Sequence, residues 1–186
     1  MTELLTLARD AGFEETTPLQ AAQLVFRPEV RDMCRADRCS SYGKSWCCPP
    51  ACPSLEEMTR RMWDYDQGVL VETVGTMADD FDYEAMMEAE ARHKERFRQL
   101  TQALYHRYGR ENVLPMGAGT CRRCARCTYP DAPCRFPEEQ VVSMEAYGLL
   151  VSQVCQDCGA VYYHGPRTMT YVSCIFLRRG AEGENK

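Results

Sequence analysis

The spacing of hydrophobic side chains predicts two strong elements in the middle of the chain. Residues 66–75, DQGVLVETVG, form a short β-branched apolar run that is typical of a buried strand. Farther along, apolar side chains recur at three- and four-residue steps, which predicts a long helix with one face in the core. This stripe consists of Met86, His93, Phe97, Leu100, Leu104 and Tyr108. Gly109 stands where a glycine commonly ends a helix.

The last third of the chain predicts one more helix and two more strands. We expect a helix over SMEAYGLLVSQVCQDCG (143–159) with Ser143 as its N-cap. Strands are expected over AVYYHG (160–165) and TMTYVSCIFL (168–177), followed by a frayed tail over 181–186. This order of elements favours an α+β fold, a small sheet packed with helices.

Length and composition limit the architecture and the compartment. A chain of 186 residues that is 45% hydrophobic can build one domain with a real core, so we expect residues 1–186 to fold together. The N-terminus has no basic, apolar leader, and no segment approaches the roughly 18 apolar residues of a membrane span. We therefore expect a soluble cytoplasmic protein. Its twelve cysteines then indicate metal or cluster ligation rather than six disulfides.

The second of two dense cysteine groups carries the most specific spacing. In CRRCARCTYPDAPC, three cysteines follow one another at two-residue intervals, and a fourth comes after a proline-containing gap. Successive CxxC steps let one loop present three thiolates to one cube, and a more distant cysteine completes the set, as in bacterial ferredoxins. The pattern favours a [4Fe-4S] cluster, with zinc as the alternative. The candidate ligands are Cys121, Cys124, Cys127 and Cys134, within a loop over 117–137.

The first group, CRADRCSSYGKSWCCPPAC, offers five cysteines in a loop over 27–52. Four suffice for one cluster, so one is a bystander, and Cys47 is the one we leave out. Pro49 and Pro50 hold the chain after Cys48 extended, which favours Cys48 as a ligand. The candidate ligands are Cys34, Cys39, Cys48 and Cys52. A zinc site built from any four of the five is the alternative. We expect both cysteine-rich loops at the edge of the sheet.

Charge separates the two loops from the rest of the chain. Residues 117–137 carry four arginines against one aspartate, and residues 27–52 carry five basic against three acidic groups, whereas the whole chain is −5. The simplest explanation is compensation, because a [4Fe-4S] cluster with four thiolates is about −2. Docking of an anionic partner is the sharper alternative. An acidic chain without a continuous basic stripe does not favour nucleic acid.

The other reactive side chains give weaker signals. His93 lies on the apolar face of the long helix, so we expect a packed histidine rather than a metal ligand. His106 and His164 have no evident partner in the sequence. Cys155 and Cys158 stand at the expected end of a helix, where the helix does not favour a thiolate, so buried or idle thiols are expected there.

The two cysteine-rich segments resemble the DUF2284 family of predicted metal-binding proteins, found largely in anaerobic bacteria and archaea. The resemblance rests on VRDMCRADRCSSYGKSWCCPPAC, on GAGTCRRCARCTYPDAPCRFPEEQVVSMEAYG and, more faintly, on VYYHGPRTMTYVSCIFL. It implies an iron–sulfur protein whose cluster cysteines are Cys34, Cys39, Cys48, Cys121, Cys124, Cys127 and Cys134, with Cys52 typical of a subgroup. Cys47, Cys155, Cys158 and Cys174 are outside that pattern. The resemblance implies a cofactor and no particular reaction.

Three functions remain at this point. Two fully ligated [4Fe-4S] clusters would make the protein an electron-transfer component that works with a partner redox enzyme, which is the function we favour. An enzyme with an open iron site for substrate is the first alternative, and it gains weight if Cys52 is not a ligand. A zinc-binding structural or adaptor protein is the second. A homo-oligomer is compatible with each.

Overall fold

The computed structural model describes residues 1–181, and its centre is a five-stranded sheet in the order β1-β2-β5-β3-β4. The strands are β1 (Glu15–Gln20), β2 (Tyr65–Thr76), β3 (Val113–Gly117), β4 (Val142–Ser143) and β5 (Thr168–Arg178). The pair β3 and β4 is parallel, and the other neighbours are antiparallel. A mixed sheet packed with helices confirms the predicted α+β class.

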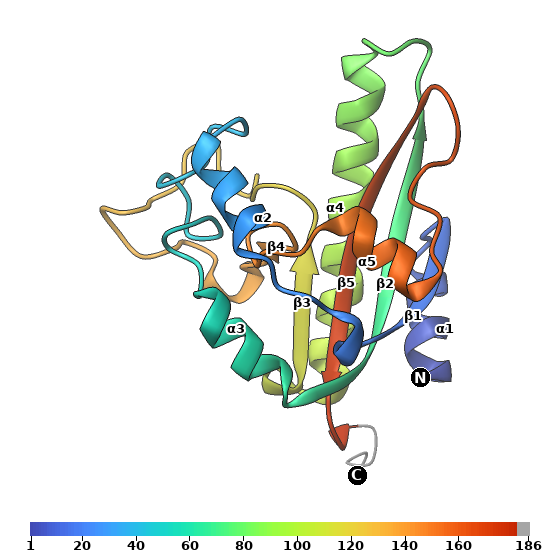
Figure 1. Cartoon of the computed structure of the whole chain (residues 1–186), viewed down its shortest axis with the longest axis vertical. Coiled ribbons are helices and arrows are strands. Elements are labelled where there is room, and N and C mark those ends of the chain that lie inside the picture. The colour runs from blue at the N-terminus through green and yellow to red at the C-terminus, as the bar shows by residue number, and fades with distance from the viewer. Residues whose placement is uncertain (182–186) are drawn as a thin grey trace.

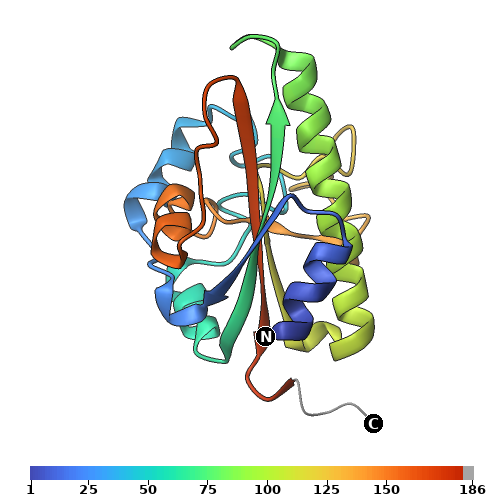
Figure 2. The same ribbon diagram turned by 90° about the vertical axis from the view of Figure 1, so that its right-hand side faces the viewer.

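Helices cover both faces of the sheet, as the edge-on view in Figure 2 shows. The α-helices are α1 (Thr2–Asp10), α2 (Pro28–Met33), α3 (Leu55–Met62), α4 (Tyr83–Tyr108) and α5 (Val151–Cys158). Short 3₁₀ turns are η1 (Ala21–Gln23), η2 (Cys34–Ala36), η3 (Arg110–Asn112) and η4 (Pro137–Glu139). On one side of the sheet lie α1 and α4, and on the other lie α2, α3 and α5 (Figure 2). No helix of residues 1–181 is long and apolar enough to cross a membrane.

The two central strands have both faces buried, which explains why the apolar run in β2 is continuous. Successive side chains of a strand point to opposite faces. Val69 and Val71 therefore pack with α1 and α4, whereas Leu70 joins the core on the opposite face. In β5, Ile175 belongs to the first of these cores and Cys174 to the second. A sheet covered on both faces needs apolar residues at consecutive positions.

The long helix begins and ends where capping residues lie. Asp82 Oδ1 accepts a hydrogen bond from Ala85 N at 3.1 Å, which caps the first turn of α4. Gly109 ends the helix with a φ of +81°, a conformation that costs glycine little. The predicted apolar stripe is buried from His93 to Tyr108.

The predicted helix over 143–159 is wrong in its first half. Ser143 is the last residue of β4, and residues 144–148 form a turn, so α5 begins only at Val151. Ser143 Oγ does accept from a backbone N–H, that of Ala146 at 3.1 Å, but within this turn. Gly148 adopts a φ of +82°, which is incompatible with a continuous α-helix. Ser143 therefore accepts the hydrogen bond expected of a capping residue, but it caps a turn rather than a helix.

The strand predicted over 160–165 is also wrong, because this segment is an irregular loop. Gly159 closes α5 in the left-handed conformation, and Gly165 has a φ of +105° at the far end. Val161, Tyr162 and Tyr163 are exposed, so their strand propensity has no sheet neighbour to pack against. The strand over 168–177 is confirmed as β5.

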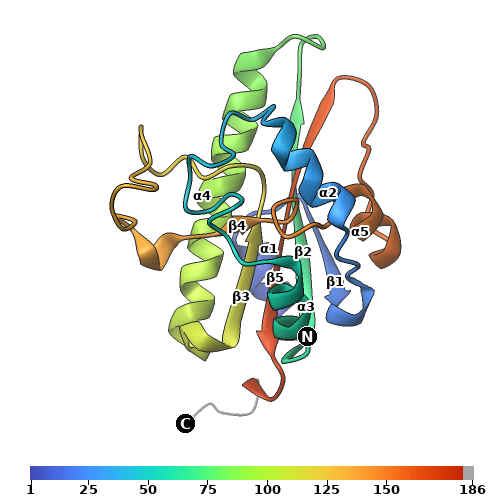
Figure 3. The same cartoon turned by 60° about the vertical axis from the view of Figure 1, so that its left-hand side comes forward.

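The two cysteine-rich segments run beside the β4 edge of the sheet, past α2 and α3, as Figures 1 and 3 show. The segment after α2 and the segment after β3 lie side by side in both views. Of the predicted frayed tail, 181–186, only Ala181 is described, and it is buried; the rest lies outside the described residues.

Candidate metal centre

The first cysteine group lies on turns whose path is fixed by one aspartate. Cys34 begins η2 directly after α2. Three residues on, Asp37 accepts hydrogen bonds from Lys44 Nζ and from Tyr42 N, both at 2.8 Å. These two donors hold the pKa of Asp37 below its usual range. The loop is therefore shaped by its own polar contacts.

Three thiols of this group face one cavity of about 360 Å³, lined by Cys34, Cys39 and Cys48. Burial raises the pKa of Cys34, and the thiols of Cys39 and Cys48 on the same cavity wall raise it further. Glu145 lines the same cavity and adds to this effect. Its Oε2 atom is buried and has no hydrogen-bond partner among residues 1–181. Nothing in the sequence indicated a role for Glu145.

Cys52 lies close to these thiols without lining the cavity. It is 5% exposed, and its Sγ atom lies 3.9 Å from Ala146 O. Burial raises its pKa to about 11, and the charges of Cys48 and Cys34 contribute in the same direction. Arg31 ties the segment to α2, because Nη2 donates to Cys52 O at 3.3 Å. Cys52 is thus a neighbour of the other three thiols that faces away from the open space.

The second group occupies the loop that leaves β3, and it lines a separate cavity of about 260 Å³. All four predicted cysteines line this cavity: Cys121, Cys124, Cys127 and Cys134. Cys121 is exposed and the other three are half-buried. The sequence grouping is therefore reproduced in space.

Cys47 lies with the second group, although it belongs to the first by sequence. It lines the second cavity and is absent from the walls of the first. Its thiol lies next to that of Cys121, and this contact lowers the pKa of Cys121 to about 6, whereas the same contact and burial raise the pKa of Cys47. The expectation that Pro49 and Pro50 hold this segment extended is wrong, because Cys48 N donates to Ser45 O at 3.2 Å and Cys52 N donates to Cys48 O at 3.2 Å, which makes it a turn. Within this turn Cys48 and Cys47 line different cavities.

The two cavities share a wall at Thr120, which lines both. The Oγ1 atom of Thr120 lies 3.7 Å from Cys48 Sγ and donates to Ser41 Oγ at 2.8 Å. A second link joins the loops where Trp46 Nε1 donates to Ala132 O at 3.1 Å. The two cysteine groups, about seventy residues apart in sequence, are therefore adjacent in the fold.

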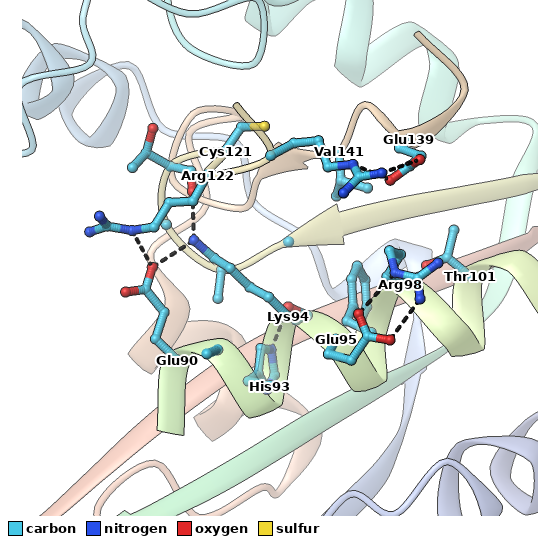
Figure 4. A pocket seen from close by; sticks show the side chains of 18 of the residues that line it. Glu90, His93, Lys94, Glu95, Arg98, Thr101, Cys121, Arg122, Glu139 and Val141 are labelled. Atoms are coloured by element: carbon cyan, nitrogen blue, oxygen red, sulfur yellow. Dashed lines mark hydrogen bonds and ion pairs between the residues drawn. The ribbon is translucent and has the colours of Figure 1, made fainter. Parts of the chain in front are cut away.

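A third cavity, of about 370 Å³, lies between α4 and the start of the second cysteine loop. Figure 4 shows Lys94 and Arg122 turned toward Glu90, with Cys121 in the same wall. Glu90 Oε1 lies 2.6 Å from Lys94 Nζ and 3.1 Å from Arg122 Nε. Burial raises the pKa of Glu90, but these two cations outweigh it and hold the pKa below its usual range. The sequence offered only the four-residue spacing of Glu90 and Lys94 as a signal.

Two of the four arginines of the second cysteine loop form ion pairs with carboxylates. Arg122 pairs with Glu90, and Arg123 Nε lies 2.9 Å from Glu139 Oε2. Arg126 and Arg135 are exposed. Only part of the positive charge counted in the sequence thus remains for compensating a cluster or meeting a partner.

His93 is a packed core residue, as predicted. Its Nδ1 atom lies 3.1 Å from Thr73 Oγ1, and its Nε2 atom lies 2.8 Å from Ser173 Oγ. Burial lowers its pKa to about 3. Because both ring nitrogens are engaged by hydroxyl groups, His93 has no free lone pair for a metal ion.

The donor set of both cavities suits soft metal chemistry, since thiolates select zinc and iron–sulfur clusters. Glu145 adds to the first cavity a carboxylate oxygen that has no hydrogen-bond partner within residues 1–181. Within residues 1–181, no three His, Cys, Asp or Glu side chains have donor atoms gathered closely enough to hold an ion as they stand. The loops bring the candidate thiols into one neighbourhood, and binding of a metal would complete the geometry.

An α+β domain with cysteines gathered at two adjoining cavities is typical of cysteine-rich metal-binding proteins. Residues 17–177 match the family model DUF2284, described as a predicted metal-binding protein, and the chain belongs to this family. This match confirms the resemblance seen in the cysteine segments. No curated protein and no solved structure matches the chain.

Proposed function

We propose that the protein binds two [4Fe-4S] clusters and transfers electrons to or from a partner redox enzyme in the cytoplasm. One observation carries the proposal: two thiol-lined cavities share the wall at Thr120. When bound, each cluster would supply a one-electron carrier at low potential. Adjacent carriers suit a relay between a donor and an acceptor. The proposal also rests on the CxxCxxC spacing, which is more typical of a cluster than of zinc.

Each loop has a defined role in this proposal. Cys34, Cys39, Cys48 and Cys52 would hold the first cluster, and Cys121, Cys124, Cys127 and Cys134 the second. Arg126 and Arg135 are exposed beside the second cavity and could meet carboxylates of an acidic protein partner. Lys94 and Arg122 share one carboxylate, Glu90, so one net positive charge remains next to Cys121 and lowers the cost of holding a dianionic cluster.

Metal analysis of anaerobically purified protein tests this function. We expect a brown protein with about eight iron and eight acid-labile sulfide per chain, since each site holds a four-iron cube. Cys48→Ala and Cys124→Ala should each lower iron by about four. Cys47→Ala removes a thiol that is adjacent to Cys48 in sequence and lines the second cavity, and it should leave iron unchanged because four other cysteines are present for each cluster. A colourless protein whose cysteine loops hold zinc would refute the proposal in favour of a structural or adaptor role.

A second candidate function has its own observation. Only three thiols of the first group line the first cavity, and Glu145 presents an unpartnered carboxylate oxygen there. This arrangement favours an enzyme whose first cluster keeps one iron open to substrate. Cys52→Ala separates the two candidates. Retention of all iron in that variant, together with turnover of a metabolite by the isolated protein, would favour the enzyme, whereas loss of about four iron would favour the carrier.

A further inference from the structure

A third group of donor side chains lies under α5, apart from both cavities. Cys155 and Cys158 come from α5, Cys174 from β5, His164 from the loop between them, and Glu72 from β2. None of the five lines any of the three cavities described above. The three cysteines are also outside the pattern of the two cysteine-rich loops.

Glu72 is the unusual member of this group, because it is a fully buried carboxylate on a central strand. Its Oε1 atom accepts from Cys155 Sγ at 3.7 Å, and its Oε2 atom lies 3.5 Å from His164 Nε2. The contact between Glu72 Oε2 and His164 Nε2 does not have hydrogen-bond geometry. Both of these atoms therefore lack a hydrogen-bond partner within residues 1–181. A buried polar atom without a partner costs on the order of 1–3 kcal/mol. This cost points to a function for the carboxylate.

The three thiols share one face of the sheet. Cys155 and Cys174 are fully buried in the same core cluster, and Cys158 packs against that cluster. Three residues apart on a helix, Cys155 and Cys158 lie on one side of α5. Burial in this core raises the pKa of Cys174, and the charges of Cys158 and Cys155 add to the rise.

His164 is oriented so that one ring nitrogen stays available. Its Nε2 atom faces Glu72, and no residue within 1–181 forms a hydrogen bond to Nδ1. A metal-binding histidine almost always donates its other ring N–H to a carboxylate or carbonyl, which fixes its tautomer. The contact with Glu72 has the form of such a support.

We propose that Cys155, Cys158, Cys174 and the Nδ1 atom of His164 bind one zinc ion, with Glu72 as the acceptor that orients His164. Three thiolates and one imidazole form a closed tetrahedral set of the kind that zinc takes in structural sites. The spacing C-x2-C-x5-H-x9-C supplies all four from one stretch of chain. The donor atoms do not yet surround a common point. Gly159 and Gly165, both at positive φ, flank the loop and let His164 swing inward.

Element-specific measurements on the full chain test this site without interference from iron. Zinc analysis of anaerobically purified protein, expressed with added zinc sulfate, should give about one zinc per chain beyond any in the cysteine-rich loops. X-ray absorption at the zinc edge should show three sulfur neighbours at about 2.3 Å and one nitrogen at about 2.0–2.1 Å. His164→Asn and Cys158→Ser should each remove this zinc and leave iron unchanged. Glu72→Gln should weaken zinc affinity about 10–100-fold.

The matched control is Gln156→Ala, which changes an exposed residue between the two α5 cysteines and should keep the zinc. His164→Asn alters a side chain that is 20% exposed, so it remains informative even where Cys158→Ser fails to fold. Retention of zinc in both variants, absence of zinc from the wild type, or a Cys155–Cys158 disulfide in the purified protein would each overturn the proposal. Absence of iron from the cysteine-rich loops of the wild-type protein would count against the proposed electron carrier but not against this zinc site.

Discussion

The buried imidazole of His93 should make the stability of this protein depend on pH. Its ring is fully buried between α4 and the sheet, and its two nitrogens contact hydroxyl groups of Thr73 and Ser173. Burial is the main cause that lowers its pKa from 6.5 to about 3, and the charges of Lys94 and Arg96 add to it. The folded protein therefore holds His93 neutral throughout the ordinary pH range.

The size of the effect follows from the difference in proton binding. In the unfolded chain His93 takes up a proton below about pH 6.5, whereas in the folded protein it does so only near pH 3. The stabilising contribution is therefore present above pH 6.5 and is lost as the pH falls toward 3, at about 1.4 kcal/mol per pH unit. Between pH 7.0 and 5.5 the free energy of unfolding should fall by about 1.3 kcal/mol from this residue alone.

Urea unfolding of the wild type and of His93→Gln, both kept anaerobic, isolates this contribution. Glutamine can still donate to one hydroxyl and accept from the other, but it does not titrate. Other titrating groups are common to both proteins and cancel in the comparison. The stability difference between the two should shrink by about 1.3 kcal/mol from pH 7.0 to 5.5. Equal losses in both proteins would show that His93 is not held neutral and would refute the reasoning.

Three further substitutions test parts of the fold that support the cysteine loops. Gly148→Ala would place a methyl group 2.6 Å from Leu55 Cδ2 and 2.9 Å from Arg27 O at a φ of +82°, so thermal unfolding should show a loss of at least about 2 kcal/mol. Ser54→Ala removes the capping box of α3 and should cost about 1 kcal/mol in urea unfolding, and an unchanged midpoint would contradict this. Trp46→Phe removes the hydrogen bond to the second cysteine loop and should cost about 1 kcal/mol, with faster metal release to a chelator; release at the wild-type rate would contradict it.

The sequence predicted the elements whose signal is long and local. The strand β2, the helix α4 and the strand β5 each span at least eleven residues and carry an uninterrupted pattern. By contrast, β4 has two residues and α2 has six, so tertiary contacts rather than propensity decide their conformation. The same competition explains the misplaced helix at Ser143, where a capping side chain is used by a turn.

The candidate site was predictable as two groups of cysteines but not as a spatial arrangement. Spacing identified which thiols share a loop, yet it could not show that Cys47 faces Cys121. Glu145 and Glu72 were missed because an isolated glutamate in sequence has no signal of burial. His164 had no visible partner because its contact with Glu72 joins residues about ninety positions apart. Such contacts become visible only when the sheet is assembled.

The links between the two cysteine loops have a thermodynamic consequence for how the sites fill. Thr120 touches both cavities, and Trp46 reaches from one loop to the backbone of the other. Binding that orders one loop therefore costs less conformational entropy when the other loop is already ordered. Because such coupling is reciprocal, each occupant must favour the other by the same factor. The two sites should load cooperatively, and partly filled chains should be rare compared with empty and fully loaded ones.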